Sequence, residues 1–312
     1  MGWMLLFFII LVGIVLWAAR FSYRLVFYNA NDKEQDIYVV PPGEQYEKVA
    51  DAILEQIREL DGLPFEQIFI TSRDGILLAA RYYHFKDGAP VQIQFHGYRG
   101  NGIREYSGGH RMAESLGYNS IVVDQRAHGK SGGHTITFGI MERYDCMDWV
   151  AYACERFGKD TPIILSGVSM GAATVLMASE LDLPGNVVAI TADCPYSSPG
   201  AIIRKVCRGM KLPDKLIYPF VVLGALIFGH FKLWDGSPVE AVKHTDIPVL
   251  LIHGEDDRFV PFEMSKEIFH SCAGPKKIVT IPEAGHGLSY MVDTKRYESS
   301  FKDFLRSCGI GK

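Results

Sequence analysis

A serine between two glycines is the feature of this sequence that most directly indicates chemistry. Ser169 stands in the run Gly167-Val168-Ser169-Met170-Gly171, between a strand-like run and a helix-like run. In a sharp strand-to-helix turn the two glycines leave room for strained backbone, and the hydroxyl projects from the strand end. The amino end of the helix also favours developing negative charge. The pattern predicts a nucleophilic serine; the alternative is a tight turn with an incidental serine.

A serine hydroxyl is a poor nucleophile at neutral pH, so it needs a neighbouring base. Among ten histidines His286 is the strongest candidate, because it lies in the loop A-G-H-G between the last predicted strand and the last helix. His253, at a strand end, is a weaker candidate. The base in turn needs a carboxylate that holds its tautomer. Asp256 and Asp257 both follow a buried strand, and both qualify by position.

The chain order of serine, aspartate and histidine resembles that of serine hydrolases in the α/β-hydrolase family, and the resemblance covers residues 65 to 308. Relatives with H-G-x-x-D-x-x-V-P after the penultimate strand use the D of that pattern, which corresponds to Asp257. An H-G turn follows their third strand, so the resemblance implies oxyanion donors at the amides of Tyr98 and Met170. It is closest to bacterial membrane-anchored members with a helical cap, in the esterase, lipase and acyl-peptidase-like branch.

Two further motifs are expected to support the backbone rather than to react. His96 belongs to the H-G turn, and we expect its side chain to stabilise that turn. The family signature D-x-R-G-x-G-x-S reads here from Asp124 to Ser131, with Ala127 in place of the first glycine. We expect this segment to be structural.

The composition argues against several other classes of protein. The chain has 32 Lys and Arg against 36 Asp and Glu, so it has no basic excess for binding nucleic acid. Its six cysteines form no C-x-x-C pair, which favours free thiols in a reducing compartment. No dinucleotide fingerprint, P-loop or cluster with metal-ligand spacing is present in the sequence. We therefore expect neither a cofactor nor a metal.

The elements that must position these residues alternate between strand and helix. Strand-like runs lie at 91–95, 120–124, 162–166, 187–192, 248–253 and 277–281, with helix-like runs at 104–116, 141–157, 170–181, 262–272 and 289–307. This alternation predicts an α/β fold, a mostly parallel sheet with helices on both faces. Residues 69–83 add a leading antiparallel hairpin, which turns at Arg73-Asp74-Gly75. The predicted hydrolase domain spans residues 65–312.

One connection is longer than a crossover requires. Residues 197–243 contain helix-like pieces near 199–210 and 214–230, and the second carries an uncharged run from Leu216. We expect a cap, or lid, that covers Ser169, with residues 216–228 as its apolar wall. A contact with lipid and a plain core helix are the alternatives.

The amino-terminal segment, residues 1–30, is predicted to be a transmembrane anchor. Residues 3–19 carry no charge and would form a helix of about 26 Å, close to the thickness of a bilayer core. No basic residue precedes this run and no small-x-small site follows it, unlike a cleaved signal peptide, and it lacks the polar face of a core helix. Arg20, Arg24 and Lys33 follow the run, which favours a cytoplasmic catalytic domain.

Residues 31–64 are predicted to be a linker followed by an amphipathic helix at 44–61. Because the candidate site lies beyond residue 65, we expect a chain without residues 1–30 to remain active.

The sequence thus predicts a membrane-anchored serine carboxylester hydrolase that acts on a small apolar or aryl ester through an acyl-enzyme. A peptidase or thioesterase would use the same residues, because a fold does not determine the leaving group. A non-catalytic protein on a hydrolase scaffold is a third hypothesis. The expected partners are the ester substrate and membrane lipid, and the oligomeric state is not predicted.

Overall fold

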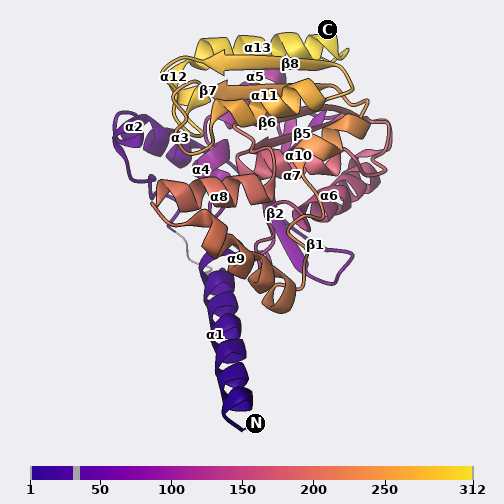
Figure 1. The fold of residues 1–312 in the computed structure, drawn as a ribbon. Coiled ribbons are helices and arrows are strands. Elements are labelled where there is room, and N and C mark those ends of the chain that lie inside the picture. The colour runs from indigo at the N-terminus through magenta and orange to yellow at the C-terminus, as the bar shows by residue number, and fades with distance from the viewer. Residues whose placement is uncertain (1, 31–35, 311–312) are drawn as a thin grey trace.

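The structure, a computed structural model, describes residues 2–30 and 36–310. Its centre is an eight-stranded sheet in the order β1-β2-β4-β3-β5-β6-β7-β8 (Figure 1). The strands are β1 (Glu66–Thr71), β2 (Leu77–Tyr83), β3 (Val91–Phe95), β4 (Asn119–Asp124), β5 (Ile163–Val168), β6 (Val187–Asp193), β7 (Val249–Gly254) and β8 (Lys276–Ile281). β2 pairs antiparallel with β1 and β4, and the other neighbours are parallel. The predicted α/β-hydrolase sheet with its leading hairpin is confirmed.

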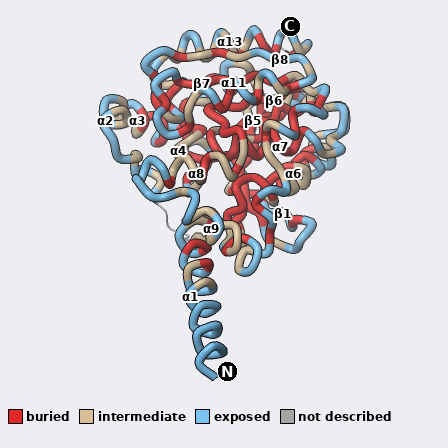
Figure 2. The backbone as a smooth tube through the Cα atoms, viewed as in Figure 1, coloured by how far each residue is buried: buried red, intermediate tan, exposed pale blue. Residues whose placement is uncertain are grey.

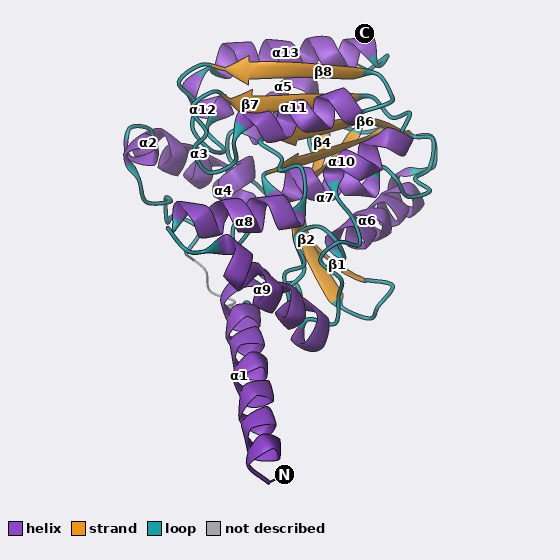
Figure 3. Ribbon diagram, in the orientation of Figure 1, coloured by secondary structure: helices purple, strands orange, loops and turns teal. Residues whose placement is uncertain are grey.

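Helices cover both faces of this sheet (Figure 3). They are α2 (Glu44–Glu47), α3 (Ala50–Gly62), α4 (Gly102–Tyr106), α5 (Gly109–Leu116), α6 (Glu142–Phe157), α7 (Met170–Ala178), α11 (Phe262–Ser271), α12 (Ser289–Val292) and α13 (Thr294–Ser307). One apolar cluster joins the sheet to α6, α7 and α11. A second joins the opposite face to α3, α4, α5 and α13. The central strands are therefore buried on both sides, as their nearly continuous apolar sequences predict.

Three predicted helices are each divided in the structure. The run at 44–61 forms α2 and α3. The run at 104–116 forms α4 and α5, which meet at Ser107 and Gly108; a Cβ on Gly108 would lie 2.4 Å from the Tyr290 ring. The run at 289–307 forms α12 and α13, because Asp293 caps the second helix by accepting a hydrogen bond from the N–H of Arg296 at 3.0 Å. The divisions of these last two runs lie beside the candidate site.

The amino-terminal helix α1 (Gly2–Val26) has two distinct parts. Residues 3–17 lie outside the body and expose large apolar side chains, so this part of the helix is pale blue in Figure 2. Ala19, Tyr23 and the following Phe27 are buried in the body. Among the described residues, α1 is the one helix long and apolar enough to cross a membrane. Lys33, which contributes to the predicted charge asymmetry, lies outside the described residues.

The insertion between β6 and β7 follows the sequence prediction in position. It contains α8 (Pro199–Gly209), α9 (Asp214–Phe228), α10 (Pro238–Ala241) and a short 3₁₀ turn, η1 (Val242–His244). α9 packs along the buried part of α1, and its Gly224 permits this approach, since a Cβ there would lie 2.6 Å from the carbonyl oxygen of Ala19. Val221 and Ala225 join Tyr23 in a third apolar cluster. The uncharged run of α9 therefore has a partner in α1.

Candidate active site

Ser169 occupies a strained turn between β5 and α7. Its φ angle is 54°, in the left-handed region that non-glycine residues rarely adopt. The flanking glycines have no room for a side chain: a Cβ on Gly167 would lie 2.3 Å from the backbone of Gly171, and one on Gly171 would lie 1.9 Å from the carbonyl oxygen of Phe95. The turn therefore depends on the glycine spacing, and it presents the serine hydroxyl at the carboxyl edge of the sheet.

His286 lies between Ser169 and Asp257. Its Nε2 is 2.9 Å from Oγ of Ser169, and its Nδ1 is 2.7 Å from Oδ2 of Asp257. Since a carboxylate only accepts hydrogen bonds, Nδ1 carries the proton, and Nε2 accepts from the serine hydroxyl. Asp256 is exposed to solvent, whereas the Asp257 side chain is buried. The structure thus brings together the three predicted residues and separates Asp257 from its neighbour.

Hydrogen bonds hold Asp257 in its charged form. Its Oδ1 accepts from the N–H groups of Phe259 and Val260, each at 2.8 Å. Burial alone would raise the pKa of Asp257. Its hydrogen bonds to His253 and His286 together outweigh this effect, so the pKa of the carboxyl lies below its ordinary value. His253, the weaker candidate base, is buried and contacts Ser265 and the Val260 carbonyl. It supports the acid and does not reach Ser169.

The turn after β3 lies beside the serine. A Cβ on Gly97 would be 3.3 Å from Cβ of Ser169, so the following residue, Tyr98, is close to the predicted nucleophile. The N–H of Gly97 donates to Oε2 of Glu105 at 2.5 Å and is therefore occupied. Met170 begins α7, where an N–H has no acceptor within its own helix. This placement agrees with oxyanion donors at Tyr98 and Met170, which stay a prediction.

Two buried histidines support this turn. Nε2 of His96 accepts from the N–H of Gln125 at 3.1 Å, and Nε2 of His128 accepts from the N–H of Arg99 at 3.0 Å. Arg99 needs such support because its φ is 52°. Burial lowers the pKa of His96 to about 4 and is the main reason why the pKa of His128 falls to about 3. Both rings are thus neutral at pH 7 and serve the backbone.

The segment 124–131 is built into the sheet. Arg126 forms a buried ion pair with Asp145 at 2.6 Å and a partly exposed ion pair with Asp74 at 3.0 Å. Ser131 accepts a hydrogen bond from the N–H of Ala79 in β2 at 2.8 Å. These contacts give the residues of the family signature a structural role in packing, as expected.

The end of α1 also contacts the turn after β3, although no local sequence pattern predicts this contact. The Tyr98 hydroxyl donates to the carbonyl of Val26 at 2.8 Å. The Arg99 guanidinium donates to the carbonyls of Leu25 and Tyr28, each at 3.0 Å. The end of α1 therefore supports the turn that is predicted to hold the oxyanion. The predicted boundary of the anchor at residue 30 lies within a packed region of the structure.

The segment before β1 covers the other side of the site. The Tyr46 hydroxyl donates to the carbonyl of His286 at 2.7 Å, and a Cβ on Gly285 would lie 2.0 Å from the Gln45 side chain. Pro41, Tyr46 and Ile53 line the cavity that contains Ser169. The segment 31–64 is predicted to be a linker and helix, and its residues Pro41, Tyr46 and Ile53 are part of the site.

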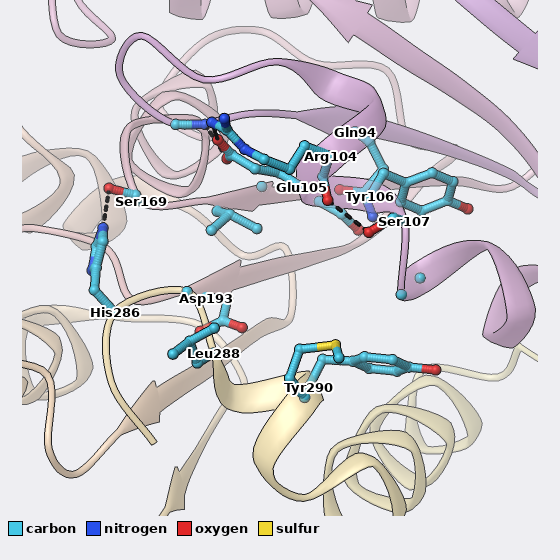
Figure 4. Close-up of a pocket in the computed structure, with 18 of the residues that line it drawn as sticks. Gln94, Arg104, Glu105, Tyr106, Ser107, Ser169, Asp193, His286, Leu288 and Tyr290 are labelled. Carbon is cyan, nitrogen blue, oxygen red and sulfur yellow. Dashed lines mark hydrogen bonds and ion pairs between the residues drawn. The ribbon is translucent and has the colours of Figure 1, made fainter. Parts of the chain in front are cut away.

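A cavity of about 250 Å³ continues from Ser169 and His286 (Figure 4). Its walls come from helices α3, α4, α5, α12 and α13, from strands β3, β5 and β6, from the turns after β3 and β5, and from Phe259. Among the described residues, none of segment 197–243 is in these walls. This corrects the expected apolar wall at 216–228: α9 packs against α1, and α8 reaches Phe259 through Lys205, whose ammonium lies 5.4 Å from that ring.

One described group of side chains has the spacing of a metal site. Ligand atoms of Cys194, Asp257 and His286 lie within 4.8 Å of one another. However, Asp257 and His286 are hydrogen-bonded to each other, and burial raises the pKa of the Cys194 thiol well above its usual value. A protonated thiol is a poor metal ligand, so this group does not fit a metal.

The chain is similar in sequence to known proteins. The zebrafish protein named lysophosphatidylserine lipase ABHD12 is 25% identical over 244 residues, which cover 72% of this chain and 60% of that protein. The uncharacterized Bacillus subtilis protein YqkD is 26% identical over 191 residues, 61% of this chain and 63% of its own. The chain therefore spans about 60% of the length of these relatives.

Among solved structures, the Pyrococcus furiosus esterase Pf2001 superposes with a TM-score of 0.62 at 23% identity. The superposition covers 80% of this chain and 94% of the esterase, which shows a common fold. Residues 95–298, which include the turn after β3, Ser169, Asp257 and His286, match the family described as alpha/beta hydrolase. The chain belongs to the alpha/beta hydrolase family.

Proposed function

We propose that this protein is a serine hydrolase that cleaves carboxylic esters. The observation that carries the proposal is the position of His286, hydrogen-bonded to Ser169 on one side and to buried Asp257 on the other. Nucleophile, base and orienting acid are the three parts that acyl transfer by serine requires. The strained serine backbone supports the proposal, because such strain concentrates at functional sites.

The reaction proceeds through an acyl-enzyme. Oγ of Ser169 attacks the ester carbonyl while Nε2 of His286 takes the hydroxyl proton, and Asp257 stabilises the imidazolium. The N–H groups of Tyr98 and Met170 stabilise the tetrahedral oxyanion, and each contributes about 10²- to 10³-fold to the rate. His286 then returns the proton to the leaving alcohol. Water, activated by the same base, releases the acid and restores Ser169.

An ester with an apolar acyl or aryl group is the favoured substrate. Phe259 lines the cavity that contains Ser169, and its ring is 5.0 Å from the His286 ring, so an apolar surface lies beside the proposed base. The names esterase and lipase among the similar proteins also favour an ester over an amide or a thioester. The test is a panel of p-nitrophenyl esters of graded chain length, run beside peptide and thioester substrates. Faster turnover of the peptide or thioester would contradict ester specificity.

We further propose that α1 anchors the protein in a membrane, with the catalytic domain in the cytosol. Residues 3–17 are apolar and exposed, and Arg20 and Arg24 follow where the helix enters the body. Retention of the helix is favoured because it continues without a break into its buried part, to Val26. Amino-terminal sequencing that begins near Arg20 would contradict the anchor. Labelling of the cysteines from outside intact cells by an impermeant maleimide would contradict the orientation.

A further inference from the structure

Polar side chains interrupt the apolar surface of three central strands. Gln92 on β3, Ser166 on β5 and Thr191 on β6 are each at least 95% buried. They lie on the sheet face that carries α3, α4 and α13, since their neighbours along the strands, such as Ile93 and Leu165, point into the opposite core. Packing in a parallel sheet favours apolar residues at such positions, so this polar row needs another explanation.

The row is hydrogen-bonded but incomplete. Nε2 of Gln92 donates to Oγ of Ser166 at 2.8 Å, and that hydroxyl is 2.6 Å from Oγ1 of Thr191. Oε1 of Gln92 is buried and has no hydrogen-bond partner among the described residues. Native proteins keep few buried acceptors without a partner, because each has lost its hydration. The amide therefore presents an acceptor that a bound group can satisfy.

All three residues line the cavity that contains Ser169 and His286. Asp193, at the end of β6, lines it as well, and its Oδ1 accepts from the Ser289 hydroxyl at 3.1 Å. In Figure 4, Asp193 and Tyr290 lie on one side of the cavity and Arg104 and Glu105 on the other, with Ser169 and His286 at one end. The polar row is thus an extension of the candidate active site.

The chemistry of this extension selects its ligand. Oε1 of Gln92 is a buried acceptor without a partner among the described residues, so it requires a hydrogen-bond donor, which a hydrocarbon chain lacks. Asp193 adds a second acceptor group to the same wall, which the Ser289 hydroxyl already contacts. The acidic residues Asp193 and Glu105 in the wall disfavour an anionic ligand. The one cation in the described wall, Arg104, is not free to bind an anion, because it contacts Glu105 at 3.6 Å and donates to the Val39 carbonyl. The volume of about 250 Å³ is below the range of about 300–1,000 Å³ for drug-sized ligands. A small neutral polyol satisfies these conditions.

We propose that this cavity binds the alcohol portion of the ester, and that this alcohol is a small polyol of about the size of glycerol. The inference rests on the proposed ester hydrolysis. The alcohol faces the cavity because His286 returns its proton to the leaving oxygen, and the residues that follow His286, Gly287 and Leu288, line the cavity wall. The apolar acyl group then lies toward Phe259 at the mouth.

Two esters that differ only in hydroxyl groups test the proposal on the full-length protein. Glycerol 1-butanoate carries two hydroxyls, and in 2-methylbutyl butanoate both are replaced by methyl groups. We expect the wild-type kcat/KM to favour the glycerol ester by at least about tenfold, since a site built for hydroxyls rejects the analogue without them. Gln92→Leu should lower this ratio to about threefold or less. The control Gln67→Leu, on the edge strand β1, should preserve it.

Each result separates this proposal from the proposed function. Equal kcat/KM for the two esters in the wild type would overturn the polyol site and leave ester hydrolysis intact. If neither ester is hydrolysed, ester hydrolysis is contradicted, and calorimetric binding of both esters to Ser169→Ala decides the polyol site alone. If Gln92→Leu does not fold, Thr191→Val, which removes one hydroxyl at nearly constant volume, replaces it. An unchanged ratio in a folded variant would overturn the role of the polar row.

Discussion

The catalytic edge of the sheet and the helix pair α1–α9 are organised by different forces. At the catalytic edge, strained backbone and directional hydrogen bonds determine where Ser169, His286 and Asp257 lie. In the helix pair, close apolar packing around Gly224 determines the arrangement, and much of the apolar surface stays exposed. An uncharged run in an insertion near a hydrolase site is therefore not by itself evidence for a lid. Its partner can be another helix far away in the sequence.

The two regions nevertheless meet at one place. The carbonyls of Leu25 and Val26, at the end of α1, accept hydrogen bonds from Arg99 and Tyr98 in the turn beside Ser169. The outer part of α1, residues 3–17, makes no such contact among the described residues. The comparison therefore predicts strong effects on catalysis at the sheet edge, intermediate effects where the regions meet, and weak effects on the exposed apolar surface.

The largest effect is expected at Asp257. Asp257→Asn should leave His286 in the wrong tautomer and reduce kcat by about 10⁴-fold, by analogy with the same change in serine proteases. Asp256→Asn is the matched control and should reduce kcat by less than about threefold, because Asp256 is exposed. Steady-state kinetics on a p-nitrophenyl ester measure both variants. The reverse order of effects would identify Asp256 as the orienting acid.

Truncations of α1 test the boundary between the regions. A chain without residues 1–17 should be active and remain in solution without detergent, since it keeps the buried part of the helix. A chain without residues 1–30 should lose at least about 10²-fold in kcat, as for the loss of an oxyanion donor, because the turn at Tyr98 loses its support. Activity and thermal unfolding of both chains measure the difference. Equal activity would show that the end of α1 is dispensable.

A smaller effect is expected from Tyr98→Phe. The substitution keeps the ring, which stacks on Phe138, and removes only the hydrogen bond to Val26. A net loss of about 1 kcal/mol for one hydrogen bond corresponds to about fivefold in rate. The measurement is kcat on a short ester, with KM as the control for binding. A change in KM alone would indicate that the hydroxyl affects substrate binding and not the turn.

The smallest catalytic effect is expected on α9. Leu226→Asp should reduce partitioning into membranes, yet it should leave the acyl-chain preference unchanged within about twofold, because Leu226 is absent from the described cavity wall. Phe259→Ala, at the cavity mouth, is the contrasting variant and should shift that preference. The same series of p-nitrophenyl esters measures both. A shifted profile in Leu226→Asp would restore a lid role for α9.

Much of the fold follows from local sequence patterns. Val91–Phe95 and the other strands were predictable because short apolar runs alternate with amphipathic ones. Ser169 was predictable because a nucleophilic serine in a strand-to-helix turn requires flanking glycines. His286 was predictable because it lies in the loop after the last strand. Asp257 was separable from Asp256 only through the family pattern, since the two are equivalent by position. The structure distinguishes them by burial.

The contacts that sequence reasoning missed join segments far apart in the chain. Tyr98 and Val26 are 72 residues apart, and Tyr46 and His286 are 240 residues apart, so no local pattern reveals them. The polar row is different, because Gln92 and Gln94 alternate with apolar residues in β3. That period of two is a visible signal of a polar face within a buried strand.

The most direct test of the account is the site of covalent labelling. A fluorophosphonate reacts with an activated serine, so the account predicts one modified peptide, which contains Ser169, when the labelled protein is digested and analysed by mass spectrometry. The folded variant Ser169→Ala, in which alanine preserves the turn between the two glycines, should remain unlabelled. A label on any other serine, or an unchanged label in Ser169→Ala, would contradict the assignment of Ser169 as the nucleophile.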